Sequence, residues 1–503
     1  MSTNAKEDGS ERAIIERENE NFSVIDALLG PERIAQLLIV GSTVHLAVIK
    51  YMQDESDYEL FQSILTTAVA ILVGFGISYR TRVANNGFYG SKLVRTAEFV
   101  PDFNVLYLLY IPTFLSLLFA RQVTIVNLAM AFNCTDLAVY MRLPAQAIFV
   151  LLSEQSYDDR FTFLKAIVLN CVLAFLMEKI GKLKSFDRVE CNLFSICLTN
   201  VLFLIESPTL HFQVLQNVLK GFLTAIAINY PLIKITSNTK PYVRSAILFS
   251  SFICVFPLTV LHIFKVEGQN PAYWLYNYIT SDSTRVKILS CWLAGLVLLI
   301  PNILVFKSNF SLDSSRKIWH FIILALVVPP FKQDPEFVKI ALAGTAVTFL
   351  AVEYLRYLKL APFGDVLDAK LRSFADFRDE RGPIIISYIY LVIGVASPIL
   401  INDSLVGVVS LGVGDSLASI VGYRWGRHRW PGTNKTFEGT VAFITATSVC
   451  SLLFQRFLGE FQDITSMKLV LICIFSGLLE GNSVLNDNIL VPSFMLIIRE
   501  VFK

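Results

Sequence analysis

The chain has 503 residues, of which 54% are hydrophobic and 17% are charged. A typical soluble domain has about 25% charged residues, so an assembly of soluble domains with polar surfaces is excluded. Disorder over most of the length is excluded as well, because disordered segments combine low hydrophobicity with high charge. The formal net charge of +2 gives no support for nucleic-acid binding.

The eight cysteines are scattered along the chain and mostly lie in apolar runs. No pair of them has the spacing of zinc ligands, and their distribution excludes a small module held together by disulfides. We therefore expect free, buried thiols.

Residues 1–33 are polar and rich in charges of both signs. A signal peptide would need a short basic start followed by an apolar stretch, so this segment is predicted to be a disordered, solvated tail.

From residue 34 onward, apolar runs such as 60–79 and 103–120 alternate with short polar segments. A membrane-spanning helix needs roughly 17–25 mostly apolar residues, and by this rule the chain has about 15 spans. The runs are continuous rather than alternating, which excludes an outer-membrane barrel. The sequence therefore predicts an all-α, polytopic integral membrane protein that interacts with the lipid bilayer.

The chemistry divides this membrane region in two. Residues 34–310 form a multi-span region with few charges inside its apolar runs, whereas residues 311–503 contain several polar clusters. Three longer polar loops stand out, at 80–101, 359–382 and 422–438. No internal repeat is evident, which disfavours a transporter built from inverted repeats.

The first polar cluster contains Arg316, Lys317 and His320, at the start of an apolar run. Their spacing places all three on one face of a helix. Two cations beside a histidine at a membrane surface would suit a phosphorylated ligand. The alternative is an ordinary basic flank that anchors a span.

The second cluster lies in residues 411–426. On a helix, Gly412, Asp415, Ser419 and Gly422 form one stripe. A packing seam of small residues would explain the glycines, but it does not explain Asp415. An ionisable group inside an apolar run needs a partner, and a metal ion, a lysine or a substrate hydroxyl would each serve.

The third cluster, residues 424–440, has several cations before a single acid, Glu438. Thr436 is predicted to cap a helix that begins near Phe437, with Gly439 and Thr440 in its first turn. Free N–H groups there would form an anion site. The spacing between Gly432 and Lys435 does not match a P-loop. A plain positive loop on the cytoplasmic side is the alternative.

The fourth cluster contains Glu480, Asp487 and Asn488. The two acids are seven residues apart, so they face the same way if one helix continues through them. Such oxygen ligands suit a hard divalent cation, whereas a polar turn between helices is the alternative. Glu353 and Arg356 either pair with each other or line the same site. Together the clusters supply what phosphoryl transfer requires: charge neutralisation, metal ligands and a group beside the attacking hydroxyl.

Gly414 to Ser419, followed by Gly422, Gly426 and the stretch from Lys435 to Thr440, resembles the signature of the CTP-dependent polyprenol kinase family. The Arg316–Lys317 pair with His320, and Glu480 with Asp487, Asn488 and Pro492, are similar to further elements of that family. The likeness extends over about residues 314–492. Asn482 departs from the pattern, because a threonine or serine is more usual at that position.

Within this family, the long multi-span N-terminal half and the stretch from Asp379 to Pro398 are similar to the dolichol kinase branch. The resemblance implies transfer of the γ-phosphate of CTP to dolichol or another polyprenol, giving dolichyl phosphate and CDP for protein glycosylation. It also implies the endoplasmic reticulum membrane, a nucleotide site facing the cytosol and a divalent metal ion, Mg²⁺ or Ca²⁺. The alternatives are a CTP-dependent kinase of diacylglycerol or phytol, a cytidylyltransferase, and a multi-span transporter.

The clusters and the resemblance together assign roles to individual residues. The predicted catalytic residues are Asp415, Lys435, Arg316, Lys317 and His320. The predicted nucleotide-binding residues are Gly414, Ser416, Ser419, Gly422, Arg424, Arg427, Arg429, Lys435, Thr436, Glu438, Gly439 and Thr440. The predicted metal ligands are Asp415, Glu480 and Asp487.

Overall fold

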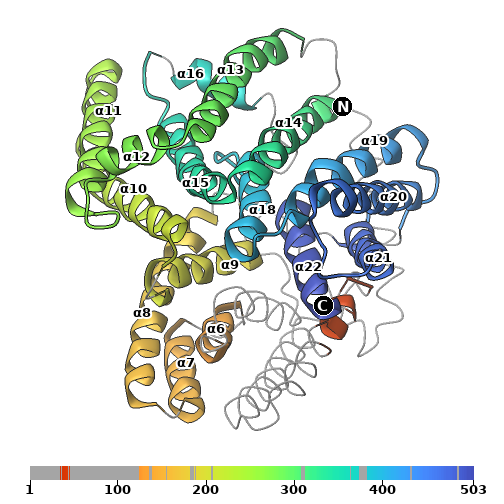
Figure 1. Cartoon of the computed structure of the whole chain (residues 1–503). Helices are drawn as coiled ribbons and strands as arrows, with labels where there is room; N and C mark the ends of the chain where they lie inside the picture. The colour runs from red at the N-terminus through yellow and green to blue at the C-terminus, as the bar shows by residue number, and fades with distance from the viewer. Residues whose placement is uncertain are drawn as a thin grey trace, which may run out of the picture. The chain divides into compact units, whose positions relative to one another are not determined.

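The computed structural model describes residues 124–503, apart from short gaps, and a few residues between 34 and 45 (Figure 1). The gaps longer than one residue are 135–138, 182–185, 206–207, 307–311, 373–381, 431–432 and 484–485. The predicted tail 1–33, the runs 60–79 and 103–120 and the loop 80–101 lie outside the described residues.

The described residues are organised as helices, with two isolated β-bridges and no longer strand among them. Within this part of the chain, five helices of 22 to 26 residues are long and apolar enough to cross a membrane. They are Tyr157–Ile180, Leu210–Ile235, Pro241–Ile263, Pro335–Tyr357 and Phe437–Leu458. The prediction of an all-α, polytopic membrane protein is therefore confirmed. The seven cysteines whose side chains are described are free, as expected, but only Cys191 and Cys473 are buried, and Cys254 and Cys291 are exposed.

The chain folds as two compact units that divide after Asn200. The described helices of the first unit are α6 (Thr124–Ala131), η2 (Phe132–Cys134), α7 (Val139–Ser153), α8 (Tyr157–Gly181) and α9 (Arg188–Thr199). Buried amides connect them: Asn133 donates to Asn170 at 2.6 Å and accepts from Gln146 at 2.9 Å. Such interhelical hydrogen bonds hold apolar helices together where the hydrophobic effect is weak.

The second unit contains every cluster that the sequence singled out from residue 311 onward. After η3 (Asn200–Leu204), which lies at the boundary, its helices are α10 (Leu210–Ile235), α11 (Pro241–Leu258), η4 (Thr259–Ile263), α12 (Pro271–Thr280), α13 (Ser283–Phe306), α14 (Leu312–Gln333), α15 (Pro335–Tyr357), α16 (Gly364–Arg372), α18 (Ser387–Asn402), η6 (Val408–Asp415), α19 (Ser416–Trp425), α20 (Phe437–Leu453), η7 (Phe454–Leu458), α21 (Ser466–Asn482) and α22 (Asp487–Phe502).

Side-chain caps fix where several of these helices begin. The Asp334 carboxylate accepts from the N–H of Phe337 at the start of α15, and Pro335 occupies the first turn, where its missing N–H costs nothing. Thr465 and Asn486 cap α21 and α22 in the same way. These caps satisfy N–H groups that the helix itself leaves without partners.

The end of α15 contacts the segment before α18, the end of α21 contacts the loop before α20, and α18 and α22 pair start to start and end to end, so the second unit has two ends. At one end, the Asn488 amide donates to the Ser387 carbonyl and the Thr433 hydroxyl donates to the Gly481 carbonyl. We call this the site end. At the other, which we call the far end, Asn402 donates to Glu500.

A seam of glycines joins η6 and α19 to α20. A Cβ added at Gly439 would lie 2.9 Å from the Ala418 carbonyl oxygen, and one at Gly414 would lie 2.6 Å from a Thr447 methyl group. One at Gly422 would lie 2.9 Å from the Thr436 hydroxyl. Of the predicted stripe, Gly422 thus packs against the start of α20, whereas a Cβ at Gly412 would lie 3.3 Å from Leu324 on α14. Asp415, in the same stripe, is the last residue of the π-helical η6.

Candidate functional site

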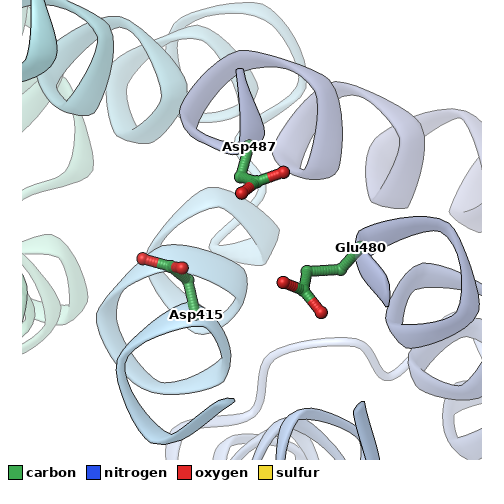
Figure 2. Close-up of side chains that lie close together, drawn as sticks. All are labelled: Asp415, Glu480 and Asp487. Atoms are coloured by element: carbon green, nitrogen blue, oxygen red, sulfur yellow. The ribbon is translucent and has the colours of Figure 1, made fainter. Parts of the chain in front are cut away.

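Three carboxylates converge at the site end of the second unit. Asp415 comes from η6, Glu480 from the last turn of α21 and Asp487 from the first residue of α22. Figure 2 shows the three side chains turned toward a common space, and one oxygen of each lies within 4.8 Å of the others. The structure thus brings together the three predicted metal ligands.

The route by which Glu480 and Asp487 converge differs from the expectation. The helix does not continue through them, because α21 ends at Asn482 and α22 begins at Asp487. The chain reverses between the two helices, and Asn486 caps the second one. The two carboxylates therefore do not converge through their spacing on one helix, as predicted. They meet because the end of α21 adjoins the start of α22.

Lys435 lies among these carboxylates, in the loop that precedes α20. Its ammonium is 2.7 Å from an oxygen of Asp487, 3.1 Å from a carboxylate oxygen of Glu480 and 2.5 Å from the Glu480 carbonyl oxygen. Burial alone would lower the pKa of Lys435, but the Asp487 and Glu480 carboxylates outweigh burial and raise this pKa above its ordinary value. The ammonium therefore stays charged.

Asp415 has cationic partners of its own, on α14. The Lys317 ammonium lies 2.6 Å from Asp415 Oδ2, and His320 Nδ1 lies 3.3 Å from the same oxygen. His320 Nδ1 also lies 3.0 Å from the Leu411 carbonyl oxygen. Of the three partners that the sequence left open for Asp415, the structure thus shows a lysine. Arg316 lies on the same helix, but its side chain is outside the described part of the structure.

The first turn of α20 is capped as predicted. The Thr436 hydroxyl accepts from the Gly439 N–H at 3.1 Å. The Phe437 N–H is used as well, because it donates to the His428 carbonyl. Two of the three N–H groups that the helix itself leaves free are thus taken, so an anion at this helix start would depend mainly on side-chain charge.

The remaining predicted nucleotide-binding residues differ in their exposure and in their contacts. Glu438 faces the preceding loop, where it lies 2.7 Å from His428 Nδ1. Thr440 is buried and accepts from the Trp430 indole at 2.9 Å. Arg424, Arg427 and Arg429 are exposed. Ser416 is buried and donates to the Leu411 carbonyl, while Ser419 is partly buried.

Two sets of contacts were not predicted. The residue pattern indicated that Lys435 binds phosphate, and nothing in it indicates the contacts of this lysine with Glu480 and Asp487. For Glu353 and Arg356, the pattern left two alternatives open. They pair with each other, with 2.5 Å between Arg356 Nη2 and Glu353 Oε1, in a buried network that includes Asp368. The three-residue spacing of Glu353 and Arg356 indicated the pair, but nothing local indicated Asp368.

Comparisons with known proteins agree with this chemistry. A family model described as the dolichol kinase N-terminal domain matches residues 3–206, and one described as dolichol kinase matches residues 190–401. Lys317 and His320 lie inside the second range, whereas the three carboxylates lie beyond it.

Curated relatives extend the match. The chain is 43% identical to dolichol kinase of Saccharomyces cerevisiae over 410 residues, which cover 80% of this chain and 78% of the yeast protein. It is 33% identical to a dolichol kinase of Schizosaccharomyces pombe, over 63% of this chain and 68% of that protein. It is also 33% identical to human dolichol kinase, over 50% of this chain and 52% of the human protein. No solved structure matches.

The predicted resemblance to the polyprenol kinases is thus confirmed, in the branch that the N-terminal half indicated. Identity at this level, over most of both chains, is not expected of the transporter alternative. The chain belongs to the dolichol kinase family.

Proposed function

We propose that the chain transfers the γ-phosphate of CTP to dolichol, giving dolichyl phosphate and CDP, and that the reaction takes place at the three-carboxylate centre. The observation that carries the location is the convergence of Asp415, Glu480 and Asp487 with the buried Lys317 and the partly buried Lys435. Family membership supports the reaction.

The donor set fits a hard divalent cation. Such ions take oxygen ligands, most often carboxylates, and three carboxylates from three different elements meet here. Asp415, Glu480 and Asp487 would hold Mg²⁺ or Ca²⁺. The bound ion would neutralise charge on the phosphate oxygens.

The two lysines complete the charge balance. Three carboxylates and two ammonium groups leave one net negative charge while His320 is neutral. Lys435 is the cation beside Glu480 and Asp487, so it is the group that would turn to the β- and γ-phosphates of CTP. Lys317 remains with Asp415 and adds positive charge to the same centre.

Asp415 would act either as a ligand of the cation or as the general base that accepts the proton of the attacking hydroxyl. Lys317 and His320 fix its orientation in either case. The lipid alcohol must bring its hydroxyl to the site end of the helices, while its apolar chain stays among helices or lipid.

We further propose that residues 311–503 form the catalytic membrane region, that residues 34–310 form the N-terminal membrane region, and that the chain has about 15 spans. The site end would face the cytosol in the endoplasmic reticulum membrane. The exposed cations Arg424, Arg427 and Arg429 support this orientation, because cytoplasmic loops carry an excess of arginine and lysine.

The decisive experiment uses purified full-length protein, CTP or ATP labelled in the γ-phosphate, and a panel of lipid alcohols. We expect label from CTP to appear in dolichyl phosphate, with one CDP released per product. Release of pyrophosphate would instead indicate a cytidylyltransferase. Preference for diacylglycerol or phytol over dolichol would contradict the proposed substrate.

A further inference from the structure

A second buried ionic network lies at the site end, around Arg356 at the end of α15. The side chain of Arg356 is 1% exposed. Its Nε lies 2.7 Å from Glu353 Oε2, and its Nη2 lies 2.5 Å from Glu353 Oε1, so the two groups form a two-pronged pair. Its remaining donors contact Asp368 on α16 and the Pro383 carbonyl.

This network holds the start of α18. Besides binding Arg356, Glu353 accepts from the N–H of Ile385 at 2.7 Å and from the Tyr388 hydroxyl. The segment that enters α18 is thus fixed from two directions, by the arginine at Pro383 and by the glutamate at Ile385. Removing one partner of such a buried pair leaves an uncompensated charge. The segment belongs to the stretch whose sequence is similar to the dolichol kinase branch.

The start of α18 in turn contacts the start of α22. The Asn488 amide donates to the Ser387 carbonyl at 3.4 Å. Further along α18, a Cβ at Gly394 would collide with the Asn488 carbonyl oxygen, so the two backbones are in direct contact. Asn488 directly follows Asp487, one of the three converging carboxylates.

We propose that Glu353 and Arg356 are positioning residues for Asp487: by fixing residues 383–388 they fix the first turn of α22, and so the spacing of the three-carboxylate centre. This inference rests on the proposed function, because it assigns the centre to metal and nucleotide. The pair touches no reacting group and acts through α18.

The test measures binding of Mn²⁺ alone to purified full-length variants, together with the KM for CTP and the Tm. Arg356→Lys keeps the charge but loses the two-pronged geometry. Partners that orient metal ligands typically account for about 10- to 100-fold in affinity, so we expect Mn²⁺ binding to weaken about tenfold. We expect the KM for CTP to rise more than kcat falls.

Tyr388→Phe is a milder variant that removes one hydroxyl from Glu353 and keeps the ion pair. This hydrogen bond to the Glu353 carboxylate is lost while the ion pair stays in place, so we expect a smaller loss than in Arg356→Lys, of about threefold to fivefold in Mn²⁺ affinity. Lys359→Gln is the matched control. Lys359 contacts Asp368 in the same network, but its side chain is 56% exposed, and we expect wild-type binding and wild-type KM.

The outcomes distinguish a failure of the proposed three-carboxylate centre from a failure of the positioning role. If wild-type protein binds Mn²⁺ and Asp487→Asn abolishes binding, the centre is confirmed. Wild-type affinity in both Arg356→Lys and Tyr388→Phe would then overturn the positioning role. If Arg356→Lys does not fold, Tyr388→Phe decides the question. If wild-type protein binds no Mn²⁺, with or without CTP, the proposed centre fails and the positioning role fails with it.

Discussion

The two ends of the second unit both contain buried cations, yet they differ in what surrounds those cations. At the far end, Lys339 pairs with Glu336 and with Asp403, and Arg499 pairs with Asp463. The side chains of those three acids are at least 39% exposed. At the site end, Asp415, Glu480 and Asp487 are at most 25% exposed.

This difference in carboxylate exposure indicates that the far end anchors helix ends, whereas the site end is suited to a reaction centre. An exposed carboxylate remains hydrated, so a far-end pair holds a helix end at a low desolvation cost. Three clustered and shielded carboxylates repel one another and lose hydration, which is costly unless cations compensate. Such an arrangement is poor as an anchor, but it is suited to exchanging a lysine for another cation, such as a divalent metal ion.

The largest effect is expected from Asp415→Asn. The amide keeps the size of the side chain but removes the negative charge that Lys317 and His320 orient. We expect kcat to fall by about 10³-fold or more, because a charged group at the reacting centre is lost. The measurement is dolichyl phosphate formed per purified molecule, with Tm and elution volume as controls for folding. Wild-type turnover in this variant would remove Asp415 from the mechanism.

Lys435→Met tests the difference between the site end and the far end most directly. It removes the cation beside Glu480 and Asp487, so turnover should fall about 10²-fold. In the absence of nucleotide, however, binding of Mn²⁺ alone should strengthen at least about tenfold, because a competing positive charge within 4 Å is gone.

The matched control for that prediction is Lys339→Met at the far end. Lys339 is paired with two carboxylates, as Lys435 is, although its side chain is more deeply buried. We expect it to change the Tm without changing Mn²⁺ binding. If both lysine variants altered Mn²⁺ binding equally, the distinction between the two ends would be lost.

Arg499→Met should affect stability rather than activity. The guanidinium lies 3.0 Å from Asp463 and stacks over the Phe461 ring at 5.6 Å. Losing these contacts should lower the free energy of unfolding by about 1–3 kcal/mol, measured as a lower Tm, with turnover per folded molecule unchanged. A loss of turnover at wild-type Tm would show that the far end takes part in catalysis.

The same pair predicts a dependence on pH. Burial raises the pKa of Asp463, but Arg499 and Lys503 outweigh burial and hold this pKa below its usual value. The stabilisation is therefore complete above the pKa of the unfolded state and is lost as the pH falls through the lower, folded-state pKa. The Tm difference between wild type and Arg499→Met should shrink over that acidic range.

The sequence sufficed where the signal was local. Apolar run length predicted the membrane class, and the threonine before Phe437 predicted the cap of α20. The resemblance indicated the correct family because the central motif, from Gly414 to Thr440, lies within one short stretch of sequence. The spacing of Glu353 and Arg356 likewise predicted that they could pair.

The sequence failed where the arrangement depends on packing between distant segments. Whether Lys435 contacts phosphate or carboxylates depends on where the ends of α21 and α22 meet. Lys317 reaches Asp415 across 98 positions of sequence, a pairing that no local pattern specifies. The Phe437 N–H looked free because the bridge between Arg429 and Thr436, which orders that loop, has no signature of its own.

The smallest effect is expected from Lys503→Gln, at the last residue of the chain. Its ammonium lies 2.9 Å from Glu500 and 3.4 Å from Asp463, and the side chain is partly exposed. A surface pair of this kind contributes about 0–1 kcal/mol, so the Tm should fall slightly and the difference should vanish in high salt. Arg499 still holds Asp463 in this variant, so Mn²⁺ binding and turnover should match wild type. A large, salt-resistant loss of Tm would mean that far-end charges act as a coupled network, and the contrast with the site end would then rest on carboxylate clustering alone.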